Sequence, residues 1–360
     1  MGNAKLPDRM KALVAYAPND YRLEEVAVPR AGKGEMVIKV EACGVCASDL
    51  KCLHGAPSLW GGDGSPQYVK APVIPGHEFI GRVVEMGDGV KGDFKVGDRV
   101  ISEQIVPCWE CRFCKTGKYW MCQKHDLYGF QNNVHGGMAE YMKFTKEGLN
   151  YRVPDDMPIE SAILIEPFGC AYHCVERSRA GNEDVVVMSG AGTLGLGMVG
   201  ALRQRNPKLL IVLDMKDERL ALAKKFGADL TMNPGKENVV ANVRSLTDGY
   251  GCDVYIEATG YPASVNQGLE MIRKLGTFVE FSVFGQPVTC DWSIIGDRKE
   301  LDVLGSHLSP YCYDTVIDWI GSGKLPTEGV VTHSFPLDRW EEAFEVAGRG
   351  EGSIKVILKP

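Results

Sequence analysis

The sequence lacks the long apolar segment that a membrane protein needs. None of its hydrophobic runs approaches the ~20 residues that a helix requires to cross a bilayer. Residues 1–10 contain no apolar core of a secretory signal, and Leu6 stands where a myristoylation signal would carry Ser or Thr. We therefore expect a soluble protein of the cytoplasm that has no membrane partner.

Internal repeats and an excess of positive charge are also absent. The lack of repeated or low-complexity segments excludes a solenoid or propeller. The formal net charge is -7 at pH 7, whereas a nucleic-acid partner requires clustered positive charge. The fractions of hydrophobic and charged residues, 44% and 24%, are those of ordinary globular proteins. Because 360 residues exceed one ordinary hydrophobic core, we expect two domains.

Cysteine, in contrast, is abundant, with twelve residues. Disulfide frameworks are typical of short exported chains, and this chain is long and shows no export signal. Four cysteines fall within one stretch, at Cys108, Cys111, Cys114 and Cys122. Four soft thiolates at short spacing suit a tetrahedral structural zinc. Iron–sulfur ligation is the competitor, but the fourth cysteine lacks the Cys-Pro ending of a ferredoxin run.

The two halves of the chain differ in their hydrophobic patterns. Up to about Ile165, short β-like runs at 36–43 and 79–84 predict an irregular β-barrel-like domain with metal sites in its loops. After Pro167, apolar runs alternate with helical patterns, including helices expected at 194–205 and 217–226. We expect strands at 185–188, 209–213, near 230, and at 253–257, 277–281 and 302–304. This alternation predicts an α/β fold, a doubly wound parallel sheet of the Rossmann type.

A glycine motif closes the first strand expected in the second half. Gly190, Gly192 and Gly195, with Thr193 and Leu194 between the last two, match G-x-G-x-x-G. The first glycine permits a tight turn, the second lets a pyrophosphate approach the backbone, and the third allows close helix–strand packing. The helix that follows offers free N–H groups to the phosphates. The motif therefore predicts a dinucleotide site.

An acidic residue ends the next expected strand, where a dinucleotide fold places a ligand for the adenosine ribose. Asp214 lies about twenty residues beyond the glycine motif. Its carboxylate would repel a 2'-phosphate, which favours NAD over NADP. The alternative is that Asp214 merely caps the following helix. Lys216 and Arg219 lie nearby and would soften the discrimination.

A second set of candidate metal ligands is dispersed along the chain. Cys46 stands two residues before Ser48, His77 and Glu78 are adjacent, and Glu166 comes near the domain junction. A catalytic zinc uses three protein ligands of these types and keeps an open position. Singly, each signal is weak, because a lone Cys is usually core filler and a lone Glu is usually a solvated surface group.

Their order in the chain resembles that of a known family. The stretch 76–100, GHEFIGRVVEMGDGVKGDFKVGDRV, is similar to the zinc signature of the medium-chain dehydrogenases. Together with the Cys46 segment, the four cysteines, Glu166-Pro167 and the glycine motif, the resemblance covers nearly the whole chain. Glu166-Pro167 resembles the polyol (sorbitol-type) branch. Stretches 102–111, 125–130, 291–295 and 299–305 resemble the bacterial members that act on the four-carbon polyols erythritol and threitol.

The resemblance implies a fold, cofactors and an activity. Residues 1–165 and 306–360 would form a GroES-like catalytic domain, and residues 166–305 an NAD-binding Rossmann domain. One catalytic zinc, one structural zinc and NAD would serve the oxidation of a short polyol, in a homodimer or homotetramer. A dehydrogenase for L-threonine or another secondary alcohol is the alternative within the family. A non-catalytic nucleotide-binding structural protein is the alternative of another class.

The resemblance also implies roles for single residues. Cys46 and His77 would bind the catalytic zinc, and either Glu78 or Glu166 would complete the set. Ser48 would accept the hydroxyl proton. Many relatives place a His three residues after that position, where this sequence has Lys51. His54 follows three residues later. The sequence does not decide which of these two residues continues the proton relay. Ser306 and Leu308 would lie near the nicotinamide carboxamide.

Overall fold

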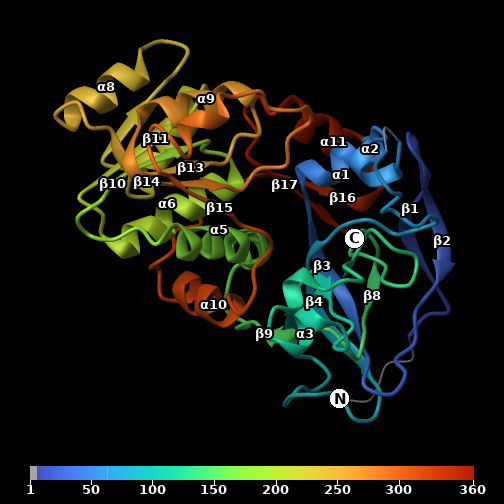
Figure 1. The fold of residues 1–360 in the computed structure, drawn as a ribbon. Coiled ribbons are helices and arrows are strands. Elements are labelled where there is room, and N and C mark those ends of the chain that lie inside the picture. Colours follow the sequence, from blue (N-terminus) through green and yellow to red (C-terminus); the bar gives the residue numbers. More distant parts are fainter. Residues whose placement is uncertain (1–5, 63) are drawn as a thin grey trace. The chain divides into compact units, whose positions relative to one another are not determined.

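The chain folds into two units in the computed structural model, which describes residues 6–62 and 64–360. Unit 1 comprises Met1–Glu166 and Thr327–Pro360, and unit 2 comprises Pro167–Pro326. In Figure 1 the ribbon of unit 1 runs from blue to green and returns in red, whereas unit 2 runs from green to orange-red.

Unit 1 is built mainly of strands. Its elements are β1 (Arg9–Ala17), β2 (Asp20–Ala27), β3 (Met36–Val45), α1 (Ala47–Leu53), α2 (Pro57–Trp60), β4 (Glu78–Met86), β5 (Arg99–Ser102), β6 (Ile105–Val106), α3 (Arg112–Lys115), η1 (Tyr119–Met121), β7 (Asp126–Leu127), β8 (Tyr141–Phe144), β9 (Asn150–Arg152), α4 (Ile159–Ala162), β16 (Val331–Pro336), η3 (Leu337–Arg339), α11 (Trp340–Arg349) and β17 (Lys355–Lys359).

A seven-stranded sheet forms the body of unit 1. Six strands follow the order β16-β17-β3-β4-β5-β9, and β8 also pairs with β3. The two strands expected at 36–43 and 79–84 are β3 and β4, which pair antiparallel. Strand β3 is buried along nearly all of its length, because both of its faces are covered. The prediction of a β-rich first domain is confirmed.

The C-terminal strand β17 joins this sheet beside β3. The two strands are antiparallel, and Val356 pairs with Val45, the last residue of β3. Because Cys46 follows Val45 directly, this pairing fixes the position at which the chain leaves the sheet and enters α1. The same pairing brings Lys355 to the end of β3.

Unit 2 alternates strands and helices. Its elements are α5 (Ile165–Ser178, which begins at the last two residues of unit 1), β10 (Val185–Ser189), α6 (Thr193–Arg205), β11 (Leu209–Leu213), α7 (Asp217–Lys225), β12 (Leu230–Met232), α8 (Val239–Leu246), β13 (Cys252–Glu257), α9 (Pro262–Met271), β14 (Ile272–Glu280), η2 (Trp292–Ile294), β15 (Asp302–Gly305) and α10 (Tyr313–Gly321).

The sheet of unit 2 has six parallel strands in the order β12-β11-β10-β13-β14-β15. This is the strand order of the doubly wound dinucleotide-binding fold. All five residues of β10 and four of the five residues of β11 are buried, as expected for central strands covered by helices on both faces. The predicted parallel sheet is confirmed, and each of its six expected strands is present.

The second domain boundary differs from the predicted one. We expected the chain to return to the first domain at residue 306, but residues 306–326 belong to unit 2 and the return begins at Thr327. The reason is packing, because α10 contacts α5: the ring of Trp319 meets that of Tyr172 edge-on, with centroids 5.2 Å apart. The first boundary follows Glu166, one residue later than expected.

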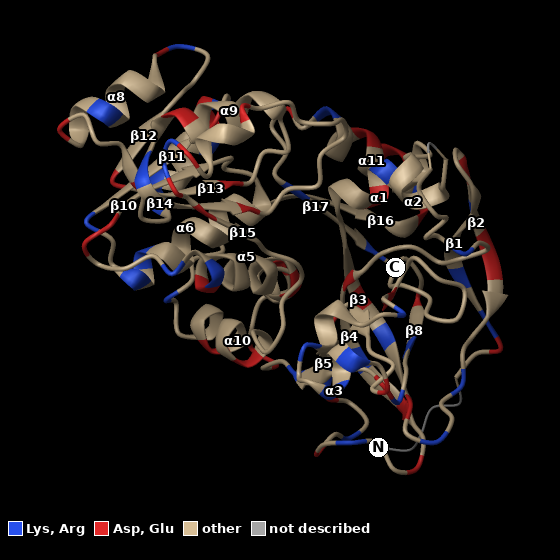
Figure 2. Ribbon diagram, viewed as in Figure 1, with Lys and Arg blue, Asp and Glu red and all other residues tan. Residues whose placement is uncertain are grey.

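Two further features of the described residues are the length of the helices and the distribution of charge. No helix among residues 6–62 and 64–360 is long and apolar enough to cross a membrane. Lys and Arg as well as Asp and Glu occur along the ribbon of each unit (Figure 2).

Candidate active site and metal centres

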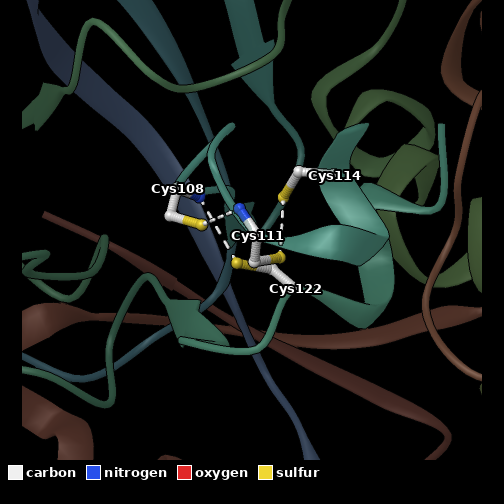
Figure 3. Close-up of side chains that lie close together, drawn as sticks. All are labelled: Cys108, Cys111, Cys114 and Cys122. Atoms are coloured by element: carbon white, nitrogen blue, oxygen red, sulfur yellow. Dashed lines mark hydrogen bonds between the residues drawn. The ribbon is translucent and has the colours of Figure 1, made fainter. Parts of the chain in front are cut away.

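The four clustered cysteines converge in one loop of unit 1, which we call the four-cysteine lobe (residues 108–122). Their sulfur atoms all lie within 4.8 Å of one another. Figure 3 shows the side chains of Cys108, Cys111, Cys114 and Cys122 pointing toward a common centre. Short α3 and η1 form the loop between them and carry Cys114 and the residues just before Cys122.

The lobe fits a single tetrahedral ion. With Zn–S bonds of about 2.3 Å, tetrahedral geometry separates the sulfur atoms by about 3.8 Å, and the Cys111 and Cys114 sulfurs are 3.5 Å apart. The backbone N–H of Gln123 lowers the pKa of Cys111 to about 6, whereas burial raises the pKa of Cys114 to about 12. A bound metal ion would hold all four as thiolates. The donor set therefore fits the predicted structural zinc.

The dispersed candidate ligands also come together in unit 1. The sulfur of Cys46, a ring nitrogen of His77 and a carboxylate oxygen of Glu78 lie within 4.8 Å of one another. Cys46 is the N-cap of α1, and His77 and Glu78 stand at the start of β4, which pairs with β3. Sheet pairing thus brings together residues that are about thirty positions apart in sequence.

Asp49 supports this group and was missed by the sequence analysis. Its carboxylate accepts a hydrogen bond from the backbone N–H of Cys46 at 2.8 Å, and its other oxygen lies 3.8 Å from Nδ1 of His77. The side chain is almost completely buried. At 3.8 Å the effect of Asp49 on the ring of His77 is electrostatic, because this separation exceeds hydrogen-bond distance. The signal was its position in α1, three residues after Cys46.

The electrostatics of the group favour a cation. Burial alone would lower the pKa of His77, but the negative charges of Asp49 and Cys46 raise it well above its usual value. An environment that stabilises a positive charge on a buried imidazole also stabilises a divalent metal ion in contact with it. A thiolate, an imidazole and a carboxylate together form a typical ligand set for a catalytic zinc.

Glu78 is held by a buried lysine. Nζ of Lys355 donates to Oε1 and Oε2 of Glu78 at 2.7 and 2.6 Å, and to the carbonyl oxygen of Val45 at 3.2 Å. Both side chains are nearly inaccessible to solvent. The charge of Glu78 raises the pKa of Lys355 against the opposing effect of burial. Both oxygens of Glu78 are therefore engaged by a cation of the chain itself.

Glu166 lies close to the group but makes a different contact. It stands in the first turn of α5, and its Oε1 accepts a hydrogen bond from Nε2 of Gln104 at 2.5 Å. Its negative charge contributes to the raised pKa of His77. Among the described residues, it is not part of the set whose ligand atoms lie within 4.8 Å of one another.

The candidates for proton transfer lie along α1. Ser48 and Lys51 are partly buried, and their spacing of three residues puts them on neighbouring positions of one helix face. Burial lowers the pKa of the Lys51 ammonium. His54 is the exposed C-cap of the helix, one turn beyond Lys51. The helix thus carries the three residues in order from the metal group toward solvent.

The glycine motif of unit 2 has the geometry of a phosphate-binding turn. Gly190 directly follows β10 and has a φ of +106°, which favours glycine, and a Cβ on Gly195 would lie 1.8 Å from the carbonyl oxygen of Gly190. Gly192 caps α6, so the first turn of that helix, with Thr193 and Leu194, begins at the motif. These two glycines are required by the turn and by helix–strand packing.

Asp214 contacts the glycine turn directly. Its Oδ2 accepts a hydrogen bond from the N–H of Ala191 at 2.7 Å, and its Oδ1 accepts one from the N–H of Lys216 at 2.8 Å. It therefore links the turn to the start of α7, and each carboxylate oxygen keeps lone pairs for further bonds. On α7, a guanidinium nitrogen of Arg219 lies 3.8 Å from the point where a Cβ of Gly192 would be. The acidic side chain of Asp214 and the basic side chain of Arg219 therefore both lie beside the glycine turn.

The remaining cofactor candidates follow β15. Ser306 donates its N–H to the carbonyl oxygen of Glu280 at 3.0 Å, and its hydroxyl oxygen is buried. Leu308 has a φ of +56°, a left-handed conformation that a leucine rarely adopts. Such strain clusters at ligand sites. Both residues stand just past the carboxyl end of a parallel strand, where dinucleotide folds bind their ligands.

Comparison with known families agrees with this geometry. Residues 32–155 match the alcohol dehydrogenase GroES-like domain, and residues 193–322 match the zinc-binding dehydrogenase domain. The chain belongs to the zinc-dependent medium-chain dehydrogenases. It is therefore an enzyme of the zinc-binding alcohol dehydrogenase type, and the expected GroES-like and Rossmann folds are confirmed.

Three similar proteins illustrate the range of this zinc-dependent family. An erythritol/L-threitol dehydrogenase of Mycolicibacterium smegmatis is 51% identical over 99% of both chains. An L-threonine 3-dehydrogenase of Pyrococcus horikoshii is 34% identical, over 98% of this chain and 100% of the relative. The crystal structure of an alcohol dehydrogenase from E. coli CFT073 in complex with NADH has a TM-score of 0.87 at 27% identity, over 98% of this chain and 100% of that one.

Proposed function

We propose that this dehydrogenase oxidises a short polyol with vicinal hydroxyls, a four-carbon one such as erythritol or threitol, to the ketose with NAD. The observation that carries the proposal is the 51% identity to an erythritol/L-threitol dehydrogenase along essentially the whole of both chains. The buried carboxylates beside Cys46 and His77 support it, because polar acceptors in a buried site disfavour an alcohol that cannot engage them.

The proposed ligands of the catalytic zinc are Cys46, His77 and Glu166. Lys355 donates hydrogen bonds to both oxygens of Glu78, and this ion pair competes with coordination of a metal ion by the same carboxylate. Oε1 of Glu166 accepts a hydrogen bond from the neutral amide of Gln104, and the negative charge of Glu166 contributes to the raised pKa of His77, which supports a place for this carboxylate beside the metal. In this arrangement the acceptor for the second hydroxyl of a polyol is Glu166 rather than Glu78.

The chemistry divides between the cofactors and the side chains. Bound zinc supplies a Lewis acid, and NAD supplies the hydride acceptor. Ser48, two residues after Cys46 in the first turn of α1, takes the hydroxyl proton. Lys51 receives it one turn later as the neutral amine and becomes the ammonium, because burial lowers its pKa and so favours the amine form. His54 exchanges the proton with solvent at the end of the helix.

The proposed preference for NAD rests on Asp214. Its carboxylate beside the glycine turn would repel a 2'-phosphate, as described for dinucleotide folds that bind the ribose hydroxyls. Arg219 on α7 would reduce the discrimination without reversing it, because Asp214 is the residue bonded to the turn itself.

A substrate panel tests the proposal. We would measure kcat/KM for erythritol, D- and L-threitol, sorbitol, L-threonine and 2-propanol with NAD, and for the best substrate with NADP. A four-carbon polyol should exceed 2-propanol by about 100-fold or more, because an unfilled polar site costs more than a missing methylene. Sorbitol in first place would contradict only the chain length. A preference for 2-propanol would contradict the polyol class.

Oxidation of L-threonine is the second candidate. It is favoured by the 34% identity to an L-threonine 3-dehydrogenase over the full chain. In that reaction the positive charge of the partly buried Lys51 ammonium would attract a substrate carboxylate. Lys51→Met would then raise the KM for threonine selectively, whereas in polyol oxidation it would mainly lower kcat by slowing proton release.

The proposed assembly is a homo-oligomer in the cytoplasm. Strand β15 is the end strand of its sheet, and its Val303 is 43% exposed. An open edge with an exposed apolar side chain is suited to pairing with a second copy of the same strand. Val303→Lys should shift the mass measured by light scattering from dimer or tetramer toward monomer, while Val303→Thr should not. A parent protein that is already monomeric would contradict the proposal.

A further inference from the structure

The short segment between β5 and β6 touches both candidate metal centres of unit 1. It consists of Glu103 and Gln104, which are both almost completely buried. In an extended segment, successive side chains point to opposite sides. Here the side chain of Gln104 reaches Glu166, and that of Glu103 reaches two tyrosines, one of them in the four-cysteine lobe.

The contact of Gln104 with Glu166 has one chemically sensible orientation. The amide NH₂ must face the carboxylate, because the amide oxygen would place two acceptors against each other. The bond, at 2.5 Å between Nε2 and Oε1, involves an ionised acceptor and so belongs to the strong class. It fixes the rotation of the carboxylate about its own axis, and thereby the direction in which the other oxygen points.

Glu103 is anchored on the opposite side. Its Oε1 accepts hydrogen bonds from the hydroxyls of Tyr119 and Tyr151, each at 2.8 Å. Tyr151 lies on β9, which pairs with β5, whereas Tyr119 lies in η1, between Cys114 and Cys122. A buried carboxylate that loses such donors is costly, so these hydroxyls hold Glu103 in place.

The backbone of the segment is held as well. The N–H of Glu103 donates to the carbonyl oxygen of Leu149, and the carbonyl oxygen of Gln104 accepts from the N–H of Tyr128, both at 2.9 Å. Two residues beyond β6 the chain reaches Cys108, the first residue of the four-cysteine lobe. Displacement of the lobe would therefore be transmitted to Gln104 over a short, hydrogen-bonded path.

We propose that Gln104 is the positioning residue for Glu166, and that the four-cysteine lobe sets Gln104 through the bond of Tyr119 to Glu103. The inference rests on the proposed role of Glu166 as a zinc ligand. The four-cysteine lobe, with the metal ion that its thiolates fit, would then have a second function. Besides stabilising its own loop, the lobe determines how the catalytic metal is held.

Metal binding, rather than turnover, is the primary readout. The catalytic site is emptied by chelation and titrated with Co²⁺, whose visible absorption bands report the ligand set. Gln104→Leu should lower the affinity for the ion about 10- to 100-fold and shift the bands, as expected when a partner of a metal ligand is removed.

The connection to the lobe is tested by Tyr119→Phe. This change removes one hydroxyl and leaves every thiolate in place, and we expect a smaller loss of Co²⁺ affinity, about two- to tenfold. Adding Tyr119→Phe to Gln104→Leu should cause no further loss of Co²⁺ affinity, because both changes act through Glu166. Tyr128→Phe is the control. It removes a buried hydroxyl that is bonded to the N–H of Thr145, and it should leave the Co²⁺ affinity unchanged.

The outcomes separate the inference from the proposed function. Glu166→Gln serves as the reference and should alter the Co²⁺ bands. If it does so and Gln104→Leu does not, the inference fails and the ligand set stands. If Glu166→Gln itself leaves the bands unchanged, the ligand set fails and the inference with it. Full additivity of Tyr119→Phe with Gln104→Leu would disprove the connection to the lobe. The melting temperature and the metal content of the lobe identify any variant that has lost its fold.

Discussion

Lys355 and Glu78 form a buried ion pair in which the ammonium nitrogen lies 2.6 and 2.7 Å from the two carboxylate oxygens. The two residues are 277 positions apart in the chain. They meet because β17 returns to pair with β3, which in turn pairs with β4, where Glu78 begins the strand. The pair thus joins the C-terminal segment to the candidate metal centre.

Breaking this pair should destabilise the protein strongly. Lys355→Met leaves the charge of Glu78 buried without its partner, and we expect the free energy of unfolding to fall by about 3–5 kcal/mol. The measurement is urea denaturation of the parent and the variant. Adding Glu78→Gln to Lys355→Met should recover most of the loss, because the amide carries no charge. A change below about 1 kcal/mol in Lys355→Met would show that the pair is dispensable.

The two metal centres should separate by function. Cys111→Ser removes one of four converging thiolates and should lower the melting temperature, because a closed structural site contributes folding free energy. His77→Ala should abolish turnover while the circular dichroism spectrum and the lobe's metal content stay as in the parent. An unfolded His77→Ala together with a fully stable Cys111→Ser would reverse the assignment of the two sites.

Cofactor choice should depend on Asp214. Asp214→Ala removes a carboxylate that is bonded to the N–H of Ala191 and should weaken NAD binding by about 1.5–3 kcal/mol, with a gain in the use of NADP. Michaelis constants for both cofactors provide the measurement. Glu218→Gln, which changes the same charge at an exposed position of α7, is the control. Equal constants in Asp214→Ala and the parent would mean that Asp214 serves only the turn.

A pH-dependent stability should originate at Glu280. Burial, and then the charge of Glu257, raise the pKa of Glu280 to about 6. Because the folded state binds this proton more tightly than the unfolded chain, stability falls as the pH rises from about 4.5 to 6 and stays lower above that. Glu280→Gln should therefore be more stable than the parent above pH 6, by about 1 kcal/mol after allowance for the exposed half of the side chain.

Denaturation in urea at pH 4.5 and pH 7.5 tests this prediction. The difference between Glu280→Gln and the parent should be present at pH 7.5 and absent at pH 4.5. Glu218→Gln should show no such dependence, since its side chain is exposed. The same difference at both pH values would mean that packing, and not the ionisation of Glu280, separates the two proteins.

Locally encoded features of the site could be predicted from the sequence. The glycine motif and the four cysteines depend on spacings within one loop, so their residues converge as soon as that loop forms. The apolar runs that became β10 and β11 are also local, because a strand covered on both faces needs an unbroken hydrophobic sequence. Cys46, His77 and Glu78 were found only through their resemblance to a family, since sheet pairing brings them together.

Only the tertiary structure decided which carboxylate is engaged by which partner. Glu78 and Glu166 were equivalent candidates in the sequence, but β17 supplies Lys355 to the first, and the β5–β6 segment supplies Gln104 to the second. The second domain boundary is similar, because residues 306–326 stay with unit 2 through the packing of α10 on α5. Such contacts depend on the register of distant strands and helices. A local pattern determines which residues are buried, whereas the fold determines what each buried charge meets.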